Sequence, residues 1–168
     1  PRVEHDLAEP AAPVEVGGEW LTAVADAQTA LAHQLVAGAR WMLAEARQHA
    51  VDRVQFGRAI GSFQAVRHKL AESLVAIEGA VAVADEAVTN ADPLVAMLAK
   101  SLAGRAARDT AKNAQQVLAG IGFTTEHRFH LWLKRTLVLD TLFGSSTTLP
   151  GAIGTHLVTQ GTPRLLTL

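Results

Sequence analysis

Apolar residues recur at intervals of three and four along most of the chain, which is the spacing of one face of an α-helix. The clearest stripe predicts a helix from about residue 63 to residue 90. Its members are Phe63, Val66, Leu70, Leu74, Ile77, Val81, Ala84 and Val88. A second stripe predicts a helix over 20–49 if Gln28 is accepted within its apolar face. Its other members are Leu21, Val24, Leu31, Leu35, Gly38 and Met42.

Capping and turn residues mark the remaining elements. Asp92 fits an N-cap and Pro93 the first position of an Ala-rich helix over 93–118, in which Gly104 and the alanines permit close packing. A helix over 126–142 is apolar on more than one face, so it must be covered from several sides. Thr148 can cap a short last helix that tolerates Pro150 in its first turn.

The predicted fold is therefore all-α: an up-and-down four-helix bundle of long helices with a short C-terminal helix. We assign this bundle to residues 19–168. Residues 1–18 contain prolines and glycines and only one short alternation of apolar and polar residues, at 14–16, so they resemble a strand remnant followed by a linker.

Composition excludes several classes of function. The 168-residue chain has no Cys, which excludes thiol chemistry, thiolate metal sites and disulfides, and fits a reducing, cytoplasmic location. A net charge of -1 gives no general attraction to nucleic acid. No apolar run reaches the roughly 18 residues that a membrane span needs. We therefore expect neither a nucleic-acid partner nor a membrane partner.

Seven histidines raise the question of a metal site. The nearest pairs are Glu45 with His49 and Glu126 with His130, each four residues apart. This spacing places two groups on one helix face without completing the carboxylate and histidine set of a helical di-iron site. We expect no metal. The sequence also has no P-loop, nucleophile elbow or dinucleotide-binding glycine fingerprint.

Three segments resemble one family. Residues 53–64 (RVQFGRAIGSFQ) resemble the R-x-x-F-G-x-x-I-x-x-F-Q signature of acyl-CoA dehydrogenases. Residues 116–126 (QVLAGIGFTTE) resemble the family's Q-x-L-G-G-x-G-F-x-x-E segment, with Ala119 at the first glycine. Residues 142–146 (LFGSS) align with its Y-E-G-T-S turn. The resemblance covers nearly the whole chain, from about Arg2 to Leu157, and implies the family's C-terminal helical domain.

The resemblance also implies cofactor contacts to FAD. One set of residues matches family positions near the adenine and pyrophosphate half of a neighbouring subunit's FAD: Arg53, Gln55, Phe56, Gln64, Gln116 and Gly120. A second set matches the turn that touches the subunit's own flavin: Gly144, Ser145 and Thr147. An arginine suits the first role because its guanidinium offers pyrophosphate a planar fork of donors.

Other interpretations of these residues remain open. Phe56 and Gln64 have an alternative role, which is to pin the loop to the bundle. Four basic residues at helical spacing either bind a CoA or FAD phosphate or form the solvated face of a bundle helix. They are Lys100, Arg105, Arg108 and Lys112.

The family's catalytic base is missing from this chain. Phe143 stands where the family's common branch has its proton-abstracting Glu, and phenylalanine cannot accept a proton. A second branch places its Glu where this chain has Ala27. The adjacent Asp26 is a shorter carboxylate about 100° around a helix from that place, and its alternative role is that of a solvated helix residue. We therefore assign no catalytic residue.

These resemblances imply a subunit of an FAD-dependent acyl-CoA dehydrogenase, which introduces an α,β double bond into an acyl-CoA thioester. The chain resembles the non-catalytic half of heteromeric members, such as those acting on steroid side chains. The family's N-terminal helical and central β domains have no counterpart here, so the chain is either a piece of a longer polypeptide or works beside a partner. Homo- or hetero-oligomers with acyl-CoA dehydrogenase subunits are expected. The alternative is a helical binding or assembly module of the same family without flavin.

Overall fold

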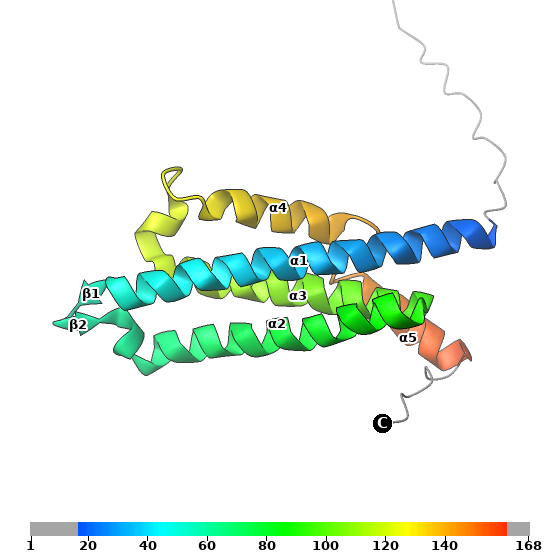
Figure 1. The fold of residues 1–168 in the computed structure, drawn as a ribbon, viewed down its shortest axis with the longest axis horizontal. Helices are drawn as coiled ribbons and strands as arrows, with labels where there is room; N and C mark the ends of the chain where they lie inside the picture. Colours follow the sequence, from blue (N-terminus) through cyan, green and yellow to red (C-terminus); the bar gives the residue numbers. More distant parts are fainter. Residues whose placement is uncertain (1–16, 161–168) are drawn as a thin grey trace, which may run out of the picture.

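The computed structural model describes residues 17–160, which form four antiparallel helices with a fifth near one end (Figure 1). The helices are α1 (Gly18–Asp52), α2 (Gln64–Asn90), α3 (Pro93–Leu118), α4 (Phe129–Thr141) and α5 (Leu149–Gln160). Two short 3-10 turns, η1 (Ile60–Ser62) and η2 (Ala119–Phe123), lie in the connections. The remaining elements are the paired strands β1 (Val54–Gln55) and β2 (Arg58–Ala59). The predicted all-α, up-and-down bundle is confirmed.

The predicted helix boundaries agree closely with the observed ones where capping is local. The helix over 93–118 is found as predicted, and the Asp92 carboxylate accepts a hydrogen bond from the Leu94 amide at 2.8 Å. The helix expected from residue 126 begins later, at Phe129, because the His127 ring nitrogen Nδ1 accepts the Phe129 amide. The expected strand remnant lies mostly outside the described residues, and Gly18 already belongs to α1.

The core depends on small side chains. α1 packs most extensively against α3, and the shared cluster is dominated by alanines around Leu35, Val36 and Ile77. Alanine lets helix backbones approach closely and loses little side-chain entropy on burial. In Figure 1, α3 lies between α1 and α2, and it also packs against α4, so its Ala-rich surface meets neighbours on several sides.

The prediction of which α2 residues are buried is partly wrong. Ile77 and Ala84 are buried, but Leu74 and Val88 are 49% and 63% exposed. Ser73, Ala80 and Ala87 face the core in their place. The helix is turned so that its small residues meet the alanines of α3, which leaves large apolar side chains on the outer surface. The α1 stripe likewise begins with an exposed Leu21.

Candidate functional site

The segment that carries the first motif is a tight hairpin that projects from one end of the bundle (Figure 1). Gln55 pairs with Arg58, so Phe56 and Gly57 form a two-residue loop. Both have positive φ, 53° and 77°, as the favoured two-residue hairpin turn requires. Gly57 adopts this conformation without strain, whereas it is rare for phenylalanine.

The hairpin presents an aromatic ring and cations to solvent. Phe56 is 91% exposed, so it does not pin the loop to the bundle. Its ring meets the Phe63 ring edge-on, at 6.1 Å between centroids, and the Arg58 guanidinium lies 4.2 Å from the centroid of the Phe63 ring. Arg53 is exposed and, among residues 17–160, forms no ion pair within 4.0 Å. Its backbone joins α1 to the hairpin through His49 and Ile60.

The end of α3 lies at the same end of the bundle as the hairpin. Gln116 is exposed and lines a groove of about 340 Å³ between α2 and α3, together with Lys69, Glu72 and Lys112. Gly120 is exposed in η2, and a Cβ atom built on it would have no neighbour within 4 Å. Packing therefore does not require a glycine at this position. Gln55 and Gln64 are also exposed.

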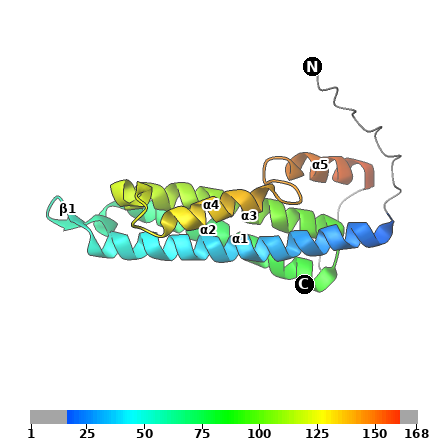
Figure 2. The same ribbon diagram turned by 90° about the horizontal axis from the view of Figure 1, so that it is seen from above.

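The second set of predicted cofactor residues lies in the turn between α4 and α5, away from the hairpin (Figure 2). Phe143 and Gly144 have φ of 53° and 97°, so the chain reverses there through two left-handed residues. Ser145 then caps α5: its hydroxyl accepts the Thr148 amide, and the Thr148 hydroxyl accepts the Ser145 amide. Thr148 is thus a partner in a reciprocal cap instead of being the cap alone. Thr147 is exposed.

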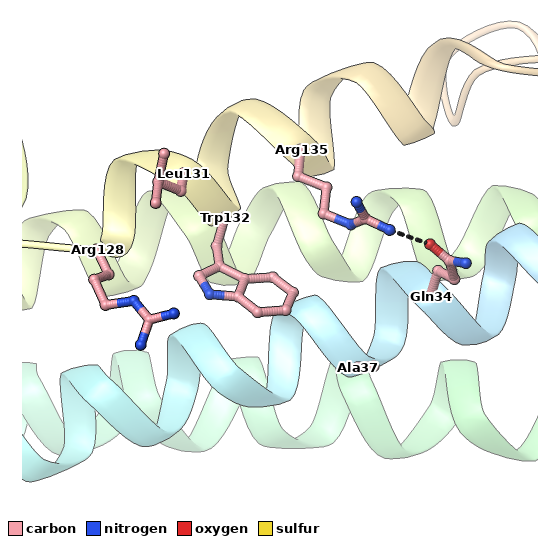
Figure 3. Close-up of a pocket in the computed structure, with 6 residues that line it drawn as sticks. All are labelled: Gln34, Ala37, Arg128, Leu131, Trp132 and Arg135. Carbon is pink, nitrogen blue, oxygen red and sulfur yellow. Dashed lines mark hydrogen bonds between the residues drawn. The ribbon is translucent and has the colours of Figure 1, made fainter.

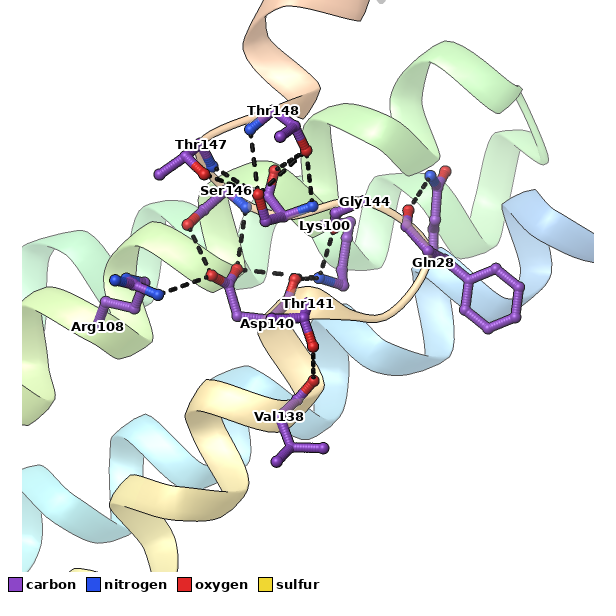
Figure 4. A network of polar contacts seen from close by, with 12 residues as sticks. Gln28, Lys100, Arg108, Val138, Asp140, Thr141, Gly144, Ser146, Thr147 and Thr148 are labelled. Atoms are coloured by element: carbon purple, nitrogen blue, oxygen red, sulfur yellow. Dashed lines mark hydrogen bonds and ion pairs between the residues drawn. The ribbon is translucent and has the colours of Figure 1, made fainter. Parts of the chain in front are cut away.

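Buried polar groups of α3 and α4 hold this turn in place (Figure 4). Lys100 of α3 is 0% exposed, and its Nζ donates to the backbone carbonyls of Asp140 and Gly144 at 2.9 and 3.1 Å. Asp140, 1% exposed, accepts the amide and hydroxyl of Ser146 at 3.0 and 3.1 Å. Arg108 also donates to this carboxylate, at 3.2 Å. From the α1 side, Gln28 donates to the Phe143 carbonyl at 2.9 Å.

The interpretation of four basic residues as one surface patch is wrong for Lys100. Burial lowers the pKa of Lys100, and the nearby Asp140 carboxylate, 4.0 Å from Nζ, partly opposes that shift. Arg108 points to the same carboxylate, and Arg105 pairs with Asp109 on its own helix at 3.8 Å. Lys112 remains as an exposed cation on the groove beside Gln116.

Asp26 does not lie with the two positions at which family members carry the catalytic Glu, Phe143 and Ala27. Asp26 lines a groove of about 320 Å³ with Thr29, His33 and residues of α2 and α3, on a different side of α1 from the Phe143 turn. Gln28, two residues further on, points to that turn instead. Phe143 is 46% exposed and Ala27 is half-buried. Neither side chain can accept a proton.

Two of the described histidines, His49 and His127, lie close enough for their charges to interact. Burial, then Arg53 and His127, lower the pKa of His49, and Asp52 opposes them. Glu45 lies 3.6 Å from His127, not beside His49 as its helical spacing alone suggests. Within the described part of the chain, no three His, Asp or Glu residues are grouped so that they could hold a metal ion. No helix within that part is both long and apolar enough to cross a membrane.

A further groove, of about 450 Å³, lies between α1 and α4 (Figure 3). Trp132 forms its floor and stacks on Trp41 at 5.2 Å between ring centroids. Arg128 and Arg135 flank the indole, and Arg135 donates to Gln34 at 2.6 Å. No residue that the sequence singled out as a cofactor contact lines this groove.

Comparison with known proteins identifies the family. The model of the acyl-CoA dehydrogenase C-terminal domain matches residues 20–158. The chain belongs to the acyl-CoA dehydrogenase family. It is 42% identical over 144 residues to acyl-CoA dehydrogenase FadE34 of Mycobacterium tuberculosis, and the match covers 82% of this chain but only 20% of that relative.

Solved acyl-CoA dehydrogenases share the fold of this domain. The glutaryl-coenzyme A dehydrogenase complex with glutaryl-CoA superposes with a TM-score of 0.81 at 24% identity, over 86% of this chain and 38% of that one. A variant of the Tcur3481-Tcur3483 steroid ACAD superposes with a TM-score of 0.75 at 26% identity, over 78% of this chain and 38% of that one. The chain therefore spans well under half of the length of these relatives.

Proposed function

We propose that this chain provides a flavin-binding surface and an oligomer surface to an FAD-dependent acyl-CoA dehydrogenase, in a subunit that does not supply the catalytic base. The observation that carries this proposal is the hairpin, which exposes the Phe56 ring at its tip and the Arg53 side chain at its base. Exposing such a ring in a strained turn costs free energy, which binding to a partner or cofactor can offset.

The exposed groups fit the chemistry of FAD. A free guanidinium is suited to pyrophosphate, and an exposed aromatic ring is suited to a nucleotide or to an apolar surface. Arg53, Gln55, Phe56, Gln64, Gln116 and Gly120 would contact a neighbouring subunit's FAD, and Gly144, Ser145 and Thr147 would contact the flavin of their own subunit. The two sets lie in different parts of the bundle, which suits contacts to two cofactors instead of one. When bound, FAD supplies the hydride acceptor for acyl-CoA oxidation.

The residue at position 143 supports the assignment of this chain to a subunit without the catalytic base. Removal of an α-proton needs a carboxylate, and neither Phe143 nor Ala27 carries one. We therefore assign proton abstraction to another subunit, in an arrangement where unlike subunits share an active site. The similarity to a steroid ACAD named for Tcur3481 and Tcur3483 supports a heteromer and suggests acyl-CoA thioesters of steroid side chains as substrates.

The alternative function is a binding or assembly module without flavin. Exposed Leu74, Val75 and Val88 on α2 favour an interface under either function. The surroundings of Gln116 and Gly120 argue against assembly alone, because both are exposed and helix packing asks for neither an amide nor a glycine there.

Co-expression separates these functions. The full-length protein is expressed with and without candidate partner subunits, and both preparations are assayed for flavin absorbance and for acyl-CoA-dependent dye reduction. We expect a yellow complex that is active only with the partner. Full activity without a partner contradicts the non-catalytic assignment, and a colourless complex favours the assembly module.

A further inference from the structure

The turn between α4 and α5 is fixed by charges that have no access to solvent. Lys100 and Asp140 form a pair whose side chains are 0% and 1% exposed. Taking both charges out of water is costly, and an apolar pair of similar volume often stabilises a protein equally well. The pair therefore calls for an explanation other than stability.

The contacts of the pair show what it specifies. Lys100 donates to the Gly144 carbonyl, and Asp140 accepts the Ser146 amide, so each side chain binds backbone of the turn itself. The intervening Phe143 and Gly144 both have positive φ. Such a conformation persists at a non-glycine residue only when the surroundings impose it. Gln28 completes the arrangement by binding the Phe143 carbonyl.

The sequence of α3 makes room for the Asp140 carboxylate. A Cβ atom on Gly104 would lie 2.1 Å from Asp140 Oδ1, so a side chain there would displace the carboxylate. Lys100 and Gly104 are one helical turn apart on the same face of α3. The glycine leaves room for the carboxylate, and Lys100 and Arg108 supply countercharges to it.

We infer that Lys100 and Asp140 form a positioning clamp that holds the backbone of Phe143, Gly144 and Ser145 in the conformation that binds the subunit's own flavin. The inference rests on the proposed function for the identity of the ligand. It adds two residues that do not touch the cofactor and act through the turn.

The test compares two ways of removing the clamp in the full-length complex. Lys100→Met removes the buried ammonium and its bond to the Gly144 carbonyl, while Arg108 can still pair with Asp140. The double variant Lys100→Met/Asp140→Leu replaces the pair with apolar residues that a buried site tolerates. Arg40→Gln is the matched control, because Arg40 is an exposed arginine of α1 that pairs with Glu78 of α2 and has no assigned role in binding. The readouts are hydrogen exchange of peptides covering 142–149, exchange of α1 peptides, and the Kd for added FAD after flavin removal.

We expect exchange in 142–149 to rise at least about tenfold in both clamp variants, with α1 protection in the double variant close to that of the parent. The Kd for FAD should rise by a similar factor, while Arg40→Gln changes neither. Unchanged exchange in both clamp variants would overturn the clamp, since the Ser145 and Thr148 cap would then suffice to hold the turn. A loosened turn with an unchanged Kd would overturn its role in positioning. A parent complex that binds no FAD would refute the proposed function and the positioning role, while exchange alone would still decide whether the clamp exists.

Discussion

Replacing Gly104 with alanine should destabilise the domain, although alanine is the better helix former. The new Cβ atom would lie 2.1 Å from Asp140 Oδ1 and 3.0 Å from Ser146 Cβ. Forcing a methyl group into a packed site costs about 1–3 kcal/mol. Moving the carboxylate breaks at least one charge-assisted hydrogen bond, worth about 1.5–3 kcal/mol. Alanine recovers about 1 kcal/mol of helix propensity. The unfolding free energy should therefore fall by about 1.5–5 kcal/mol.

Gly79→Ala is the matched control, because Gly79 is an exposed α2 glycine with no atom within 4 Å of a built Cβ. It should stabilise the domain by about 0.5–1 kcal/mol. Urea unfolding followed by circular dichroism measures both variants. In an Asp140→Ala background the main clash disappears, so Gly104→Ala should cost at least about 1 kcal/mol less there than in the parent. If Gly104→Ala is as harmless as Gly79→Ala, the close approach of Asp140 to α3 is wrong.

Three further predictions test local features. His49 has a folded-state pKa below 6.5, so the unfolded chain binds its proton more readily, and the unfolding free energy should fall as pH drops below about 6.5. In His49→Gln, urea midpoints measured from about pH 7.5 to pH 5 should lose the part of the pH dependence that His49 causes. Gly57→Ala should lower the unfolding free energy by about 1–2 kcal/mol because Gly57 has a positive φ. Gly120→Ala should change it by no more than about 0.5 kcal/mol, and equal shifts in melting temperature for the two variants would contradict this difference. Asp92→Ala removes the α3 cap and should cost about 0.5–2 kcal/mol in urea unfolding; no loss would mean that the Leu94 amide finds another acceptor.

The helices could be predicted because their signals are local. The 3.6-residue periodicity and the Asp92 cap depend only on nearby residues, and the helix over 93–118 was placed correctly. The buried face of α2 could not be predicted in the same way. The choice between Ser73 and Leu74 depends on the neighbouring helix, whose alanines admit the smaller side chain closely.

The clamp was missed because spacing along a helix does not reveal burial. Lys100 and Arg108 look like members of a basic surface, yet both point to Asp140. A signal was present: Lys100 lies on the Ala-rich face of α3, one turn before Gly104. The positive φ of Phe143 could not have been foreseen, because residue type disfavours it and only tertiary contacts impose it.

Flavin occupancy of an Arg53 variant tests the central claim most directly. In the full-length complex, Arg53→Ala should lower the affinity for FAD about tenfold to a hundredfold, the equivalent of one charge-assisted bond of about 1.5–3 kcal/mol. Arg53→Lys should recover part of it, since an ammonium keeps the charge but not the fork of donors. Arg47→Ala, at an exposed arginine of α1, serves as the control.

Flavin content and melting temperature are measured together on each Arg53 variant. We predict strongly reduced flavin in Arg53→Ala with the melting temperature of the flavin-free protein unchanged, because Arg53 is exposed and lies outside the core. Unchanged flavin content with a lowered melting temperature would contradict the account, since Arg53 would then shape the hairpin and not bind the cofactor.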